Sequence, residues 1–104
     1  MDKNFEISGL TLKFNTHYDD YGTFMEETRD PIYRTILLAF KELKEKDDAV
    51  VNVIASVGET DFESNLEFTK ARLEILTDVI NPYFEKLEEY ETCAEVMKVF
   101  SELQ

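Results

Sequence analysis

The sequence has little of what cross-linked, nucleotide-binding or membrane-spanning proteins are built from. Its 104 residues include one cysteine, one histidine, three glycines and two prolines. A lone cysteine, Cys93, excludes an intramolecular disulfide and a zinc site made only of cysteines. Three scattered glycines exclude a glycine-rich phosphate-binding loop. No apolar run approaches the roughly 20 residues that a membrane-spanning helix needs.

Basic residues are also scarce. The 11 Lys and Arg stand against 23 Asp and Glu, which gives a formal net charge of −12. Such a chain repels phosphate backbones and anionic lipid surfaces, so we expect no direct binding to nucleic acid and none to a membrane. The N-terminus lacks the basic-then-apolar order of a signal peptide. We therefore expect a cytoplasmic protein of a bacterial or phage-infected host cell.

The chain does have the composition of a globular protein. Hydrophobic residues make up 43% of it, and a single core is feasible at this length, so we expect one domain over 1–104. Residues 5–14 alternate between apolar and polar, with a shift of phase at Ser8-Gly9. This predicts either a hairpin with a turn at Ser8-Gly9 or one strand with a bulge at Gly9, the hairpin being slightly less favoured.

The middle of the chain carries a helix signal and a strand signal. Residues 15–30 are typical of a loop that leads into a short helical turn, with a strand over 21–28 as the alternative. Asp30-Pro31 has the features of a helix start, an acceptor at the N-cap followed by proline, and the apolar spacing after it predicts a helix over 31–46. The β-branched run 49–57 predicts a buried strand.

The second half reads as helical. The capping-box spacing of Thr60 and Glu63, followed by apolar residues three and four apart, predicts a helix over 61–80 that ends or kinks at Asn81-Pro82. A helical stripe then runs from Tyr83 to the end, with a break near 91–92 as an option. The predicted fold class is α+β: a small β-sheet (N-terminal strand or hairpin plus strand 49–57) packed by three or more helices, with a helical C-terminal half.

One segment holds residue types used in acid–base or metal chemistry. His17 lies beside Asp19 and Asp20, which suits a base or a metal ligand. No Ser or Cys nucleophile is near in sequence, no second histidine exists, and the aspartates do not fit an EF-hand loop. We therefore predict a surface loop here, no cofactor, no metal and no enzymatic activity, with an unusual site around His17 as the enzymatic alternative.

The acidic residues are the functional candidate. Residues 49–104 carry 12 acids and 4 bases, a net of −8, against 11 acids and 7 bases, a net of −4, for residues 1–48. Many of the acids recur at helical spacing, with exposed tyrosines expected beside them. The predicted partner-binding residues are Glu63, Glu67, Glu74 and Asp78 on one helix face, Glu85, Glu88, Glu95 and Glu102 on the next segment, and Tyr83 and Tyr90. Such rows imitate phosphates to a protein that binds nucleic acid through Lys and Arg. The alternative is that they serve only solubility.

In length, acidity and lack of catalytic motifs the chain is similar to the small inhibitors of phages and mobile elements and to toxin-immunity proteins. The similarity is one of composition, without a shared motif. We predict an acidic protein-binding module, an inhibitor or immunity-type protein such as an anti-defence protein. It would act as a nucleic-acid mimic that docks a basic site on a partner protein. The alternative is a structural or assembly subunit, or a homodimer or larger homo-oligomer, suggested by the broad apolar run over 36–40.

Overall fold

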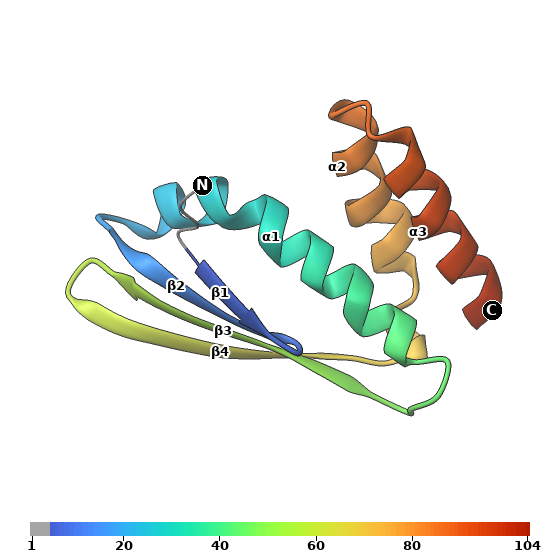
Figure 1. Cartoon of the computed structure of the whole chain (residues 1–104), viewed down its shortest axis with the longest axis horizontal. Coiled ribbons are helices and arrows are strands. Elements are labelled where there is room, and N and C mark those ends of the chain that lie inside the picture. Colours follow the sequence, from blue (N-terminus) through green and yellow to red (C-terminus); the bar gives the residue numbers. More distant parts are fainter. Residues whose placement is uncertain (1–4) are drawn as a thin grey trace. The chain divides into compact units, whose positions relative to one another are not determined.

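The structure is a computed structural model that describes residues 5–104, and its contacts divide the chain into two compact units. Unit 1 holds residues 5–36 and Val50–Glu67, and unit 2 holds Leu37–Ala49 and Phe68–Gln104. The elements in chain order (Figure 1) are β1 (Phe5–Ser8), β2 (Thr11–Tyr18), α1 (Tyr21–Glu42), β3 (Ala49–Val57), β4 (Thr60–Phe68), the 3-10 helix η1 (Lys70–Arg72), the π-helix η2 (Leu76–Ile80), α2 (Asn81–Lys86) and α3 (Tyr90–Leu103).

Unit 1 is built on a four-stranded mixed sheet with the order β1-β2-β3-β4. β1 pairs with β2 antiparallel, and β2 pairs with β3 parallel. Parallel neighbours need a crossover between them, and α1 lies in that connection. Only two residues join β3 to β4, so this pair is an antiparallel hairpin.

The N-terminal segment is a hairpin and not one bulged strand. Its loop is Gly9-Leu10, and the φ of +61° at Gly9 is what the first loop position of a type II′ turn requires. The pairing sets Phe5 opposite Phe14. The predicted turn at residues 8–9 was therefore one position too early.

Helix α1 begins ten residues before the predicted start and runs through Pro31. Asp20 forms the N-terminal cap: Thr23 donates its backbone N–H to Oδ1 at 2.8 Å and its hydroxyl to Oδ2 at 3.0 Å. Asp30, predicted to be the cap, instead accepts a hydrogen bond from Arg34 Nε at 2.6 Å. Of the segment 15–30, residues 15–18 end β2 and residues 21–30 begin α1, so the predicted short helical turn is part of a long helix. The predicted loop, the alternative strand over 21–28 and the helix start at Asp30-Pro31 are wrong.

Removing the Asp20 cap is expected to lower stability in a pH-dependent way. The hydrogen bonds from Thr23 hold the Asp20 pKa below its ordinary value. Because the folded pKa is depressed, the carboxylate stabilises the fold above the ordinary carboxyl range, and this stabilisation is lost as the pH falls through the folded pKa. We expect Asp20→Ala to lower the urea midpoint at neutral pH, and Asp20→Asn, which still caps but does not titrate, to flatten its decline in acid. Equal acid profiles for wild type and Asp20→Asn would contradict this role.

Strand β3 confirms the predicted strand at its predicted bounds, but the segment that follows does not form the predicted helix. Residues 60–68 form β4, and helical structure begins only at η1. Alternate β4 side chains are exposed on one face and half-buried or buried on the other. The predicted architecture is therefore wrong: the sheet has four strands, and the second half of the chain starts with a β-hairpin before its helices.

The core of unit 1 is aromatic. Phe24 of α1 is 1% exposed, and its ring centroid lies 5.7 Å from those of Phe14 and Phe62 and 5.3 Å from that of Tyr18. These rings come from α1, β2 and β4, so they fix the helix to one face of the sheet. The other face is covered by no described element of unit 1, and most of its side chains are polar, with Val50 and Ile54 of β3 among them.

The core of unit 2 lies among its helices. Phe40 packs on Phe68 with a centroid distance of 5.3 Å, and Ile80, Phe84 and Val96 are fully buried. The helical structure does not end at Asn81-Pro82, because η2 continues directly into α2. It is interrupted at Leu87–Glu89, between α2 and α3, and not at the predicted optional position near 91–92. No helix of residues 5–104 is both long and apolar enough to cross a membrane.

Candidate functional site: an acidic edge strand

The first predicted acidic row does not lie on one helix. Glu63 and Glu67 are on β4 in unit 1, whereas Glu74 and Asp78 follow η1 in the helical part of unit 2. All four are exposed. The helix face that would have aligned them does not exist, because the first half of the predicted helix is a strand.

The second predicted row is divided at the turn between α2 and α3. Glu85 is exposed on α2, and Glu88 adopts a φ of +58° in the turn. Backbone hydrogen bonds from Glu88 N to Glu85 O and from Glu89 N to Phe84 O, both 3.0 Å, close the helix end as a Schellman motif. This turn interrupts the predicted seven-residue repeat.

The two predicted tyrosines differ in surroundings. Tyr83 is half-buried, with its ring centroid 5.0 Å from that of Phe84. Tyr90 begins α3 and is 64% exposed. Only Tyr90 presents most of its ring to solvent.

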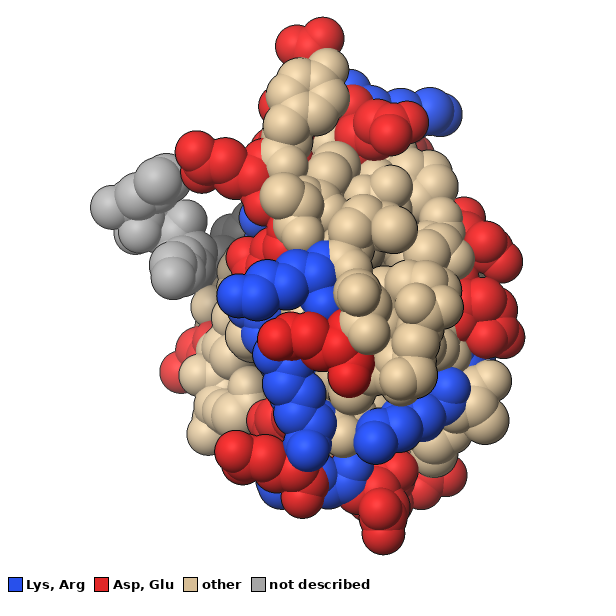
Figure 2. All heavy atoms as spheres, turned by 90° about the vertical axis from the view of Figure 1, so that its right-hand side faces the viewer, with Lys and Arg blue, Asp and Glu red and all other residues tan. Residues whose placement is uncertain are grey.

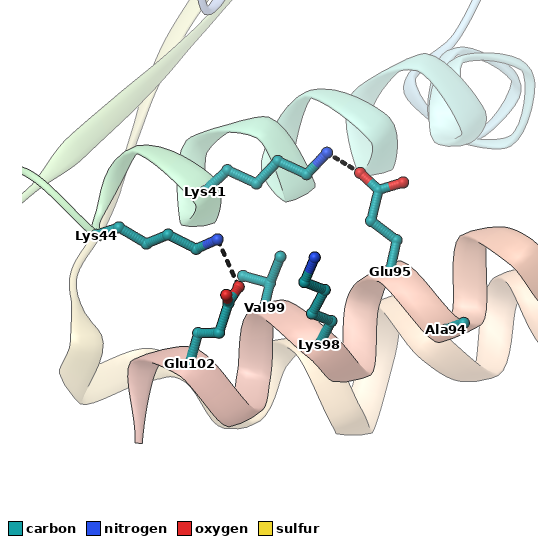
Figure 3. Close-up of a pocket in the computed structure, with 7 residues that line it drawn as sticks. All are labelled: Lys41, Lys44, Ala94, Glu95, Lys98, Val99 and Glu102. Atoms are coloured by element: carbon teal, nitrogen blue, oxygen red, sulfur yellow. Dashed lines mark ion pairs between the residues drawn. The ribbon is translucent and has the colours of Figure 1, made fainter.

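Two of the predicted acids lie on α3, and both already have partners. Glu95 pairs with Lys41 near the end of α1, and Glu102 pairs at 2.5 Å with Lys44 in the turn that follows α1 (Figure 3). The hydrogen bond from Lys44 lowers the Glu102 pKa. Lys98 points between the two pairs into a hollow of about 540 Å³. Three lysines therefore face two carboxylates here, which leaves no acidic row on this side of α3.

The excess of acidic residues is not concentrated in the C-terminal helices, contrary to the prediction from the sequence. The described residues of unit 1 include ten acids and three bases, a net of −7, while unit 2 has 12 acids and seven bases, a net of −5. On the face shown in Figure 2, Lys and Arg lie among Asp and Glu beside a broad neutral surface. The C-terminal helices are therefore not the main seat of the acidity.

The acids of β4 form a more coherent set. Asp61, Glu63 and Glu67 alternate along the strand and are exposed, so they lie on the face of the sheet that α1 does not cover. We call this set the acidic edge, because β4 has a strand neighbour on one side only. Asn52 of β3 donates its side-chain N–H to Glu63 Oε2 at 3.2 Å and to Asn65 Oδ1. No ion pair within residues 5–104 engages Asp61 or Glu63.

On its other face, β4 borders an apolar hollow of about 130 Å³ within unit 1. The hollow lies between α1 and the sheet, and apart from one serine and one tyrosine its lining side chains are hydrocarbon or thioether. The lining residues are Tyr21, Phe24, Met25 and Ile32 of α1, Val53 of β3, and Phe62, Ser64 and Leu66 of β4. Sequence reasoning missed this hollow, because it placed residues 62–66 on a helix.

His17 has a neighbour that its sequence context did not reveal. The parallel pairing of β2 and β3 sets His17 opposite Ser56, and His17 Nδ1 lies 3.0 Å from Ser56 Oγ. Asp19 Oδ1 is 4.0 Å from His17 Nε2, and its side chain is 98% exposed. At this distance Asp19 makes no hydrogen bond to the imidazole, unlike the aspartate that orients the histidine of a catalytic triad.

Metal-binding groups and the thiol of Cys93 are the remaining candidates for chemistry. Residues 5–104 hold no group of three or more His, Cys, Asp or Glu side chains arranged to bind a metal ion. Cys93 is half-buried, and its Sγ lies 3.8 Å from the Asn81 carbonyl oxygen. Burial and the carboxylates of Glu85 and Glu89 raise the Cys93 pKa. A raised pKa leaves less thiolate and so lowers the reactivity of this thiol.

Comparison of the chain with protein-family models, with curated proteins and with solved structures found no match.

Proposed function

We propose that the protein is an acidic binding module that docks a basic surface of a partner protein on the acidic edge of β4. The observation that carries the proposal is the set Asp61, Glu63 and Glu67 on one exposed sheet face. Two of these, Asp61 and Glu63, take part in no ion pair within the described chain. Carboxylates that are not neutralised within the protein can attract Lys and Arg of a partner over a distance and speed association.

The spacing of these acids suits a basic protein segment in an extended conformation. Same-face residues on a strand recur every ~6.8 Å, so Asp61 and Glu63 are about that far apart and Glu67 is about twice as far from Glu63. The repeat of the acidic edge matches Lys or Arg at alternate positions of an extended chain.

The alternative of a self-assembling subunit loses its motivating feature. Within the apolar run over 36–40, only Leu38 is exposed, at 43%, and the other four side chains are buried. The run therefore serves the interior of the protein. A second contact surface is not needed to explain it.

The dependence of the association rate on salt concentration tests the proposal. A partner captured from the native host and identified by mass spectrometry should bind with an association rate that falls about tenfold or more as ionic strength rises, because screening shortens the reach of the carboxylates. Surface plasmon resonance over a series of NaCl concentrations measures this. A rate independent of salt would remove the electrostatic docking mechanism.

A further inference from the structure

We propose that the partner is held as a fifth strand on the outer edge of β4, and that it is an extended segment in which Lys or Arg alternates with apolar residues. This inference rests on the proposed function and adds the binding mode and the sequence pattern of the partner. Two independent features of unit 1 carry it. They are the backbone of β4 and the apolar hollow beside that strand.

The backbone of β4 is available along its outer side. In a hairpin with a two-residue loop, the pair next to the loop exchanges backbone hydrogen bonds, and alternate pairs after it do the same. Counting from Val57 and Thr60, the residues Phe62, Ser64 and Leu66 bond toward β3. Asp61, Glu63 and Asn65 therefore direct N–H and C=O outward. The side-chain hydrogen bond between Asn52 and Asn65 agrees with this register.

The helix leaves β4 only partly covered. On β3, the side chains that face α1, Val51, Val53 and Ala55, are at most 5% exposed. The corresponding side chains of β4, Phe62, Ser64 and Leu66, are only half-buried. The hollow of about 130 Å³ lies at these residues. An apolar cavity of about 150 Å³ holds a benzene ring, so this one has room for a single apolar side chain.

A strand added to β4 would bond to the outward backbone groups of β4 and place a side chain at the apolar hollow. Successive side chains of a strand point to opposite faces, and directly opposite residues of paired strands have Cβ atoms about 5 Å apart. A residue opposite Ser64 would point toward α1 and the hollow. Its neighbours in sequence would point to the other face, beside Glu63 and the rest of the acidic edge. Backbone bonds would supply affinity, and the two faces would select the alternating pattern.

The charges also argue against a second copy of the same chain on this edge. Pairing of two β4 strands would bring their carboxylates together on one face, and like charges placed opposite each other are destabilising. A basic segment instead places ammonium or guanidinium groups against them. The acidic edge therefore admits a foreign basic strand and disfavours edge-to-edge self-association.

The test uses capped synthetic peptides of about nine residues, the length of β4. The reference peptide alternates Lys with Val and has one central Phe. Each variant peptide carries one change. The Phe is replaced by Ala, every Lys is replaced by Glu, or N-methyl groups are placed on the alternate backbone amides that point to one edge of the extended peptide or to its other edge. We expect the reference peptide to bind, the Ala peptide to bind about tenfold more weakly, and the Glu peptide not to bind. N-methylation of one edge should abolish binding, while methylation of the other edge should leave it intact.

Two variants of the protein address the same contacts. Asn65→Pro removes one outward N–H without removing a carboxylate, and it should weaken the reference peptide about tenfold, while Asn65→Ala, which keeps that N–H, should bind within about threefold of wild type. Ser64→Ile fills the hollow and should make the Phe and Ala peptides bind equally. The N-methylated peptides provide the same test on the unaltered protein should Asn65→Pro not fold.

The outcomes separate this proposal from the function on which it rests. Salt-sensitive binding that is lost in Asp61→Lys/Glu63→Lys but unaffected by N-methylation would overturn strand addition and leave acidic docking standing. Binding of the reference peptide that ignores salt and these two acids would overturn acidic docking itself. No binding of the reference peptide, or a dimer in light scattering with β4 amides protected from exchange, would also overturn the fifth-strand proposal.

Discussion

Phe24→Ala is expected to destabilise the protein by about 3–5 kcal/mol, the cost typical of truncating a buried Phe. Phe24 is 1% exposed and its ring contacts those of Phe14, Tyr18 and Phe62. Truncating Phe24 removes the ring that packs α1 against β2 and β4. Because whole domains are stable by only about 5–15 kcal/mol, urea denaturation followed by circular dichroism should show a large loss of the free energy of unfolding.

Ile7→Ala is the matched control. Ile7 also lies in unit 1, but its side chain is 49% exposed. Most of its apolar surface is already in water, so we expect a loss of less than about 1 kcal/mol. Similar losses for the two variants would show that Phe24 does not occupy the centre of the unit 1 core.

Charge reversal on β4, by Asp61→Lys with Glu63→Lys, should lower the rate of association with a basic partner about tenfold or more. The two substitutions turn an attractive face into a repulsive one at the point where the partner is proposed to dock. Both side chains are exposed, so the fold should tolerate the change. Stopped-flow or surface plasmon resonance at low salt measures the effect, and circular dichroism checks the fold.

Glu74→Lys with Glu85→Lys provides the control for net charge. These acids are exposed in unit 2 and belong to the rows first predicted for partner binding. The pair changes the net charge of the protein by the same amount but leaves the acidic edge intact. We expect a much smaller drop in rate. An equal drop for both pairs would mean that overall charge, and not the acidic edge, drives association.

Some elements could be predicted because their pattern of apolar residues fits only one kind of secondary structure. The β-branched run over 49–57 is a strand at the predicted bounds, and helical segments are correctly expected over much of 31–46 and after Tyr83. For residues 60–68 the signal was ambiguous. Phe62 and Leu66 share a face in a helix and in a strand, since residues four apart do so at either period. Phe68, six residues from Phe62, fits only the strand.

Helix α1 was shortened in the prediction because its N-terminal half carries few apolar residues. In that half, Thr28 is 1% exposed, and its hydroxyl donates to the carbonyl oxygen of Phe24. A buried threonine whose hydroxyl bonds within the helix acts as an apolar residue, which a polar-versus-apolar pattern does not count. Pro31 was taken as a start signal, although the helix passes through it.

The sequence predicted that the candidate site is made of exposed acidic residues, but not which of these residues lie together. Glu63 and Glu67 were correctly expected to be exposed, but their grouping with Glu74 and Asp78 depended on a helix that does not form. The pairing of Glu95 with Lys41 and of Glu102 with Lys44 joins segments more than fifty residues apart. Ser56 reaches His17 across 39 residues through a parallel strand pair. Such contacts come from topology, which local spacing does not encode.

The central claim is that a basic partner docks on the acidic edge of β4. Its most direct test is an NMR titration of isotope-labelled protein with the captured partner, in which the backbone amide of each residue reports its own environment. The account predicts that the largest shift changes fall on Asp61–Glu67 and on the α1 residues around the hollow, and that salt diminishes them. Changes confined to η2, α2 and α3 would contradict it.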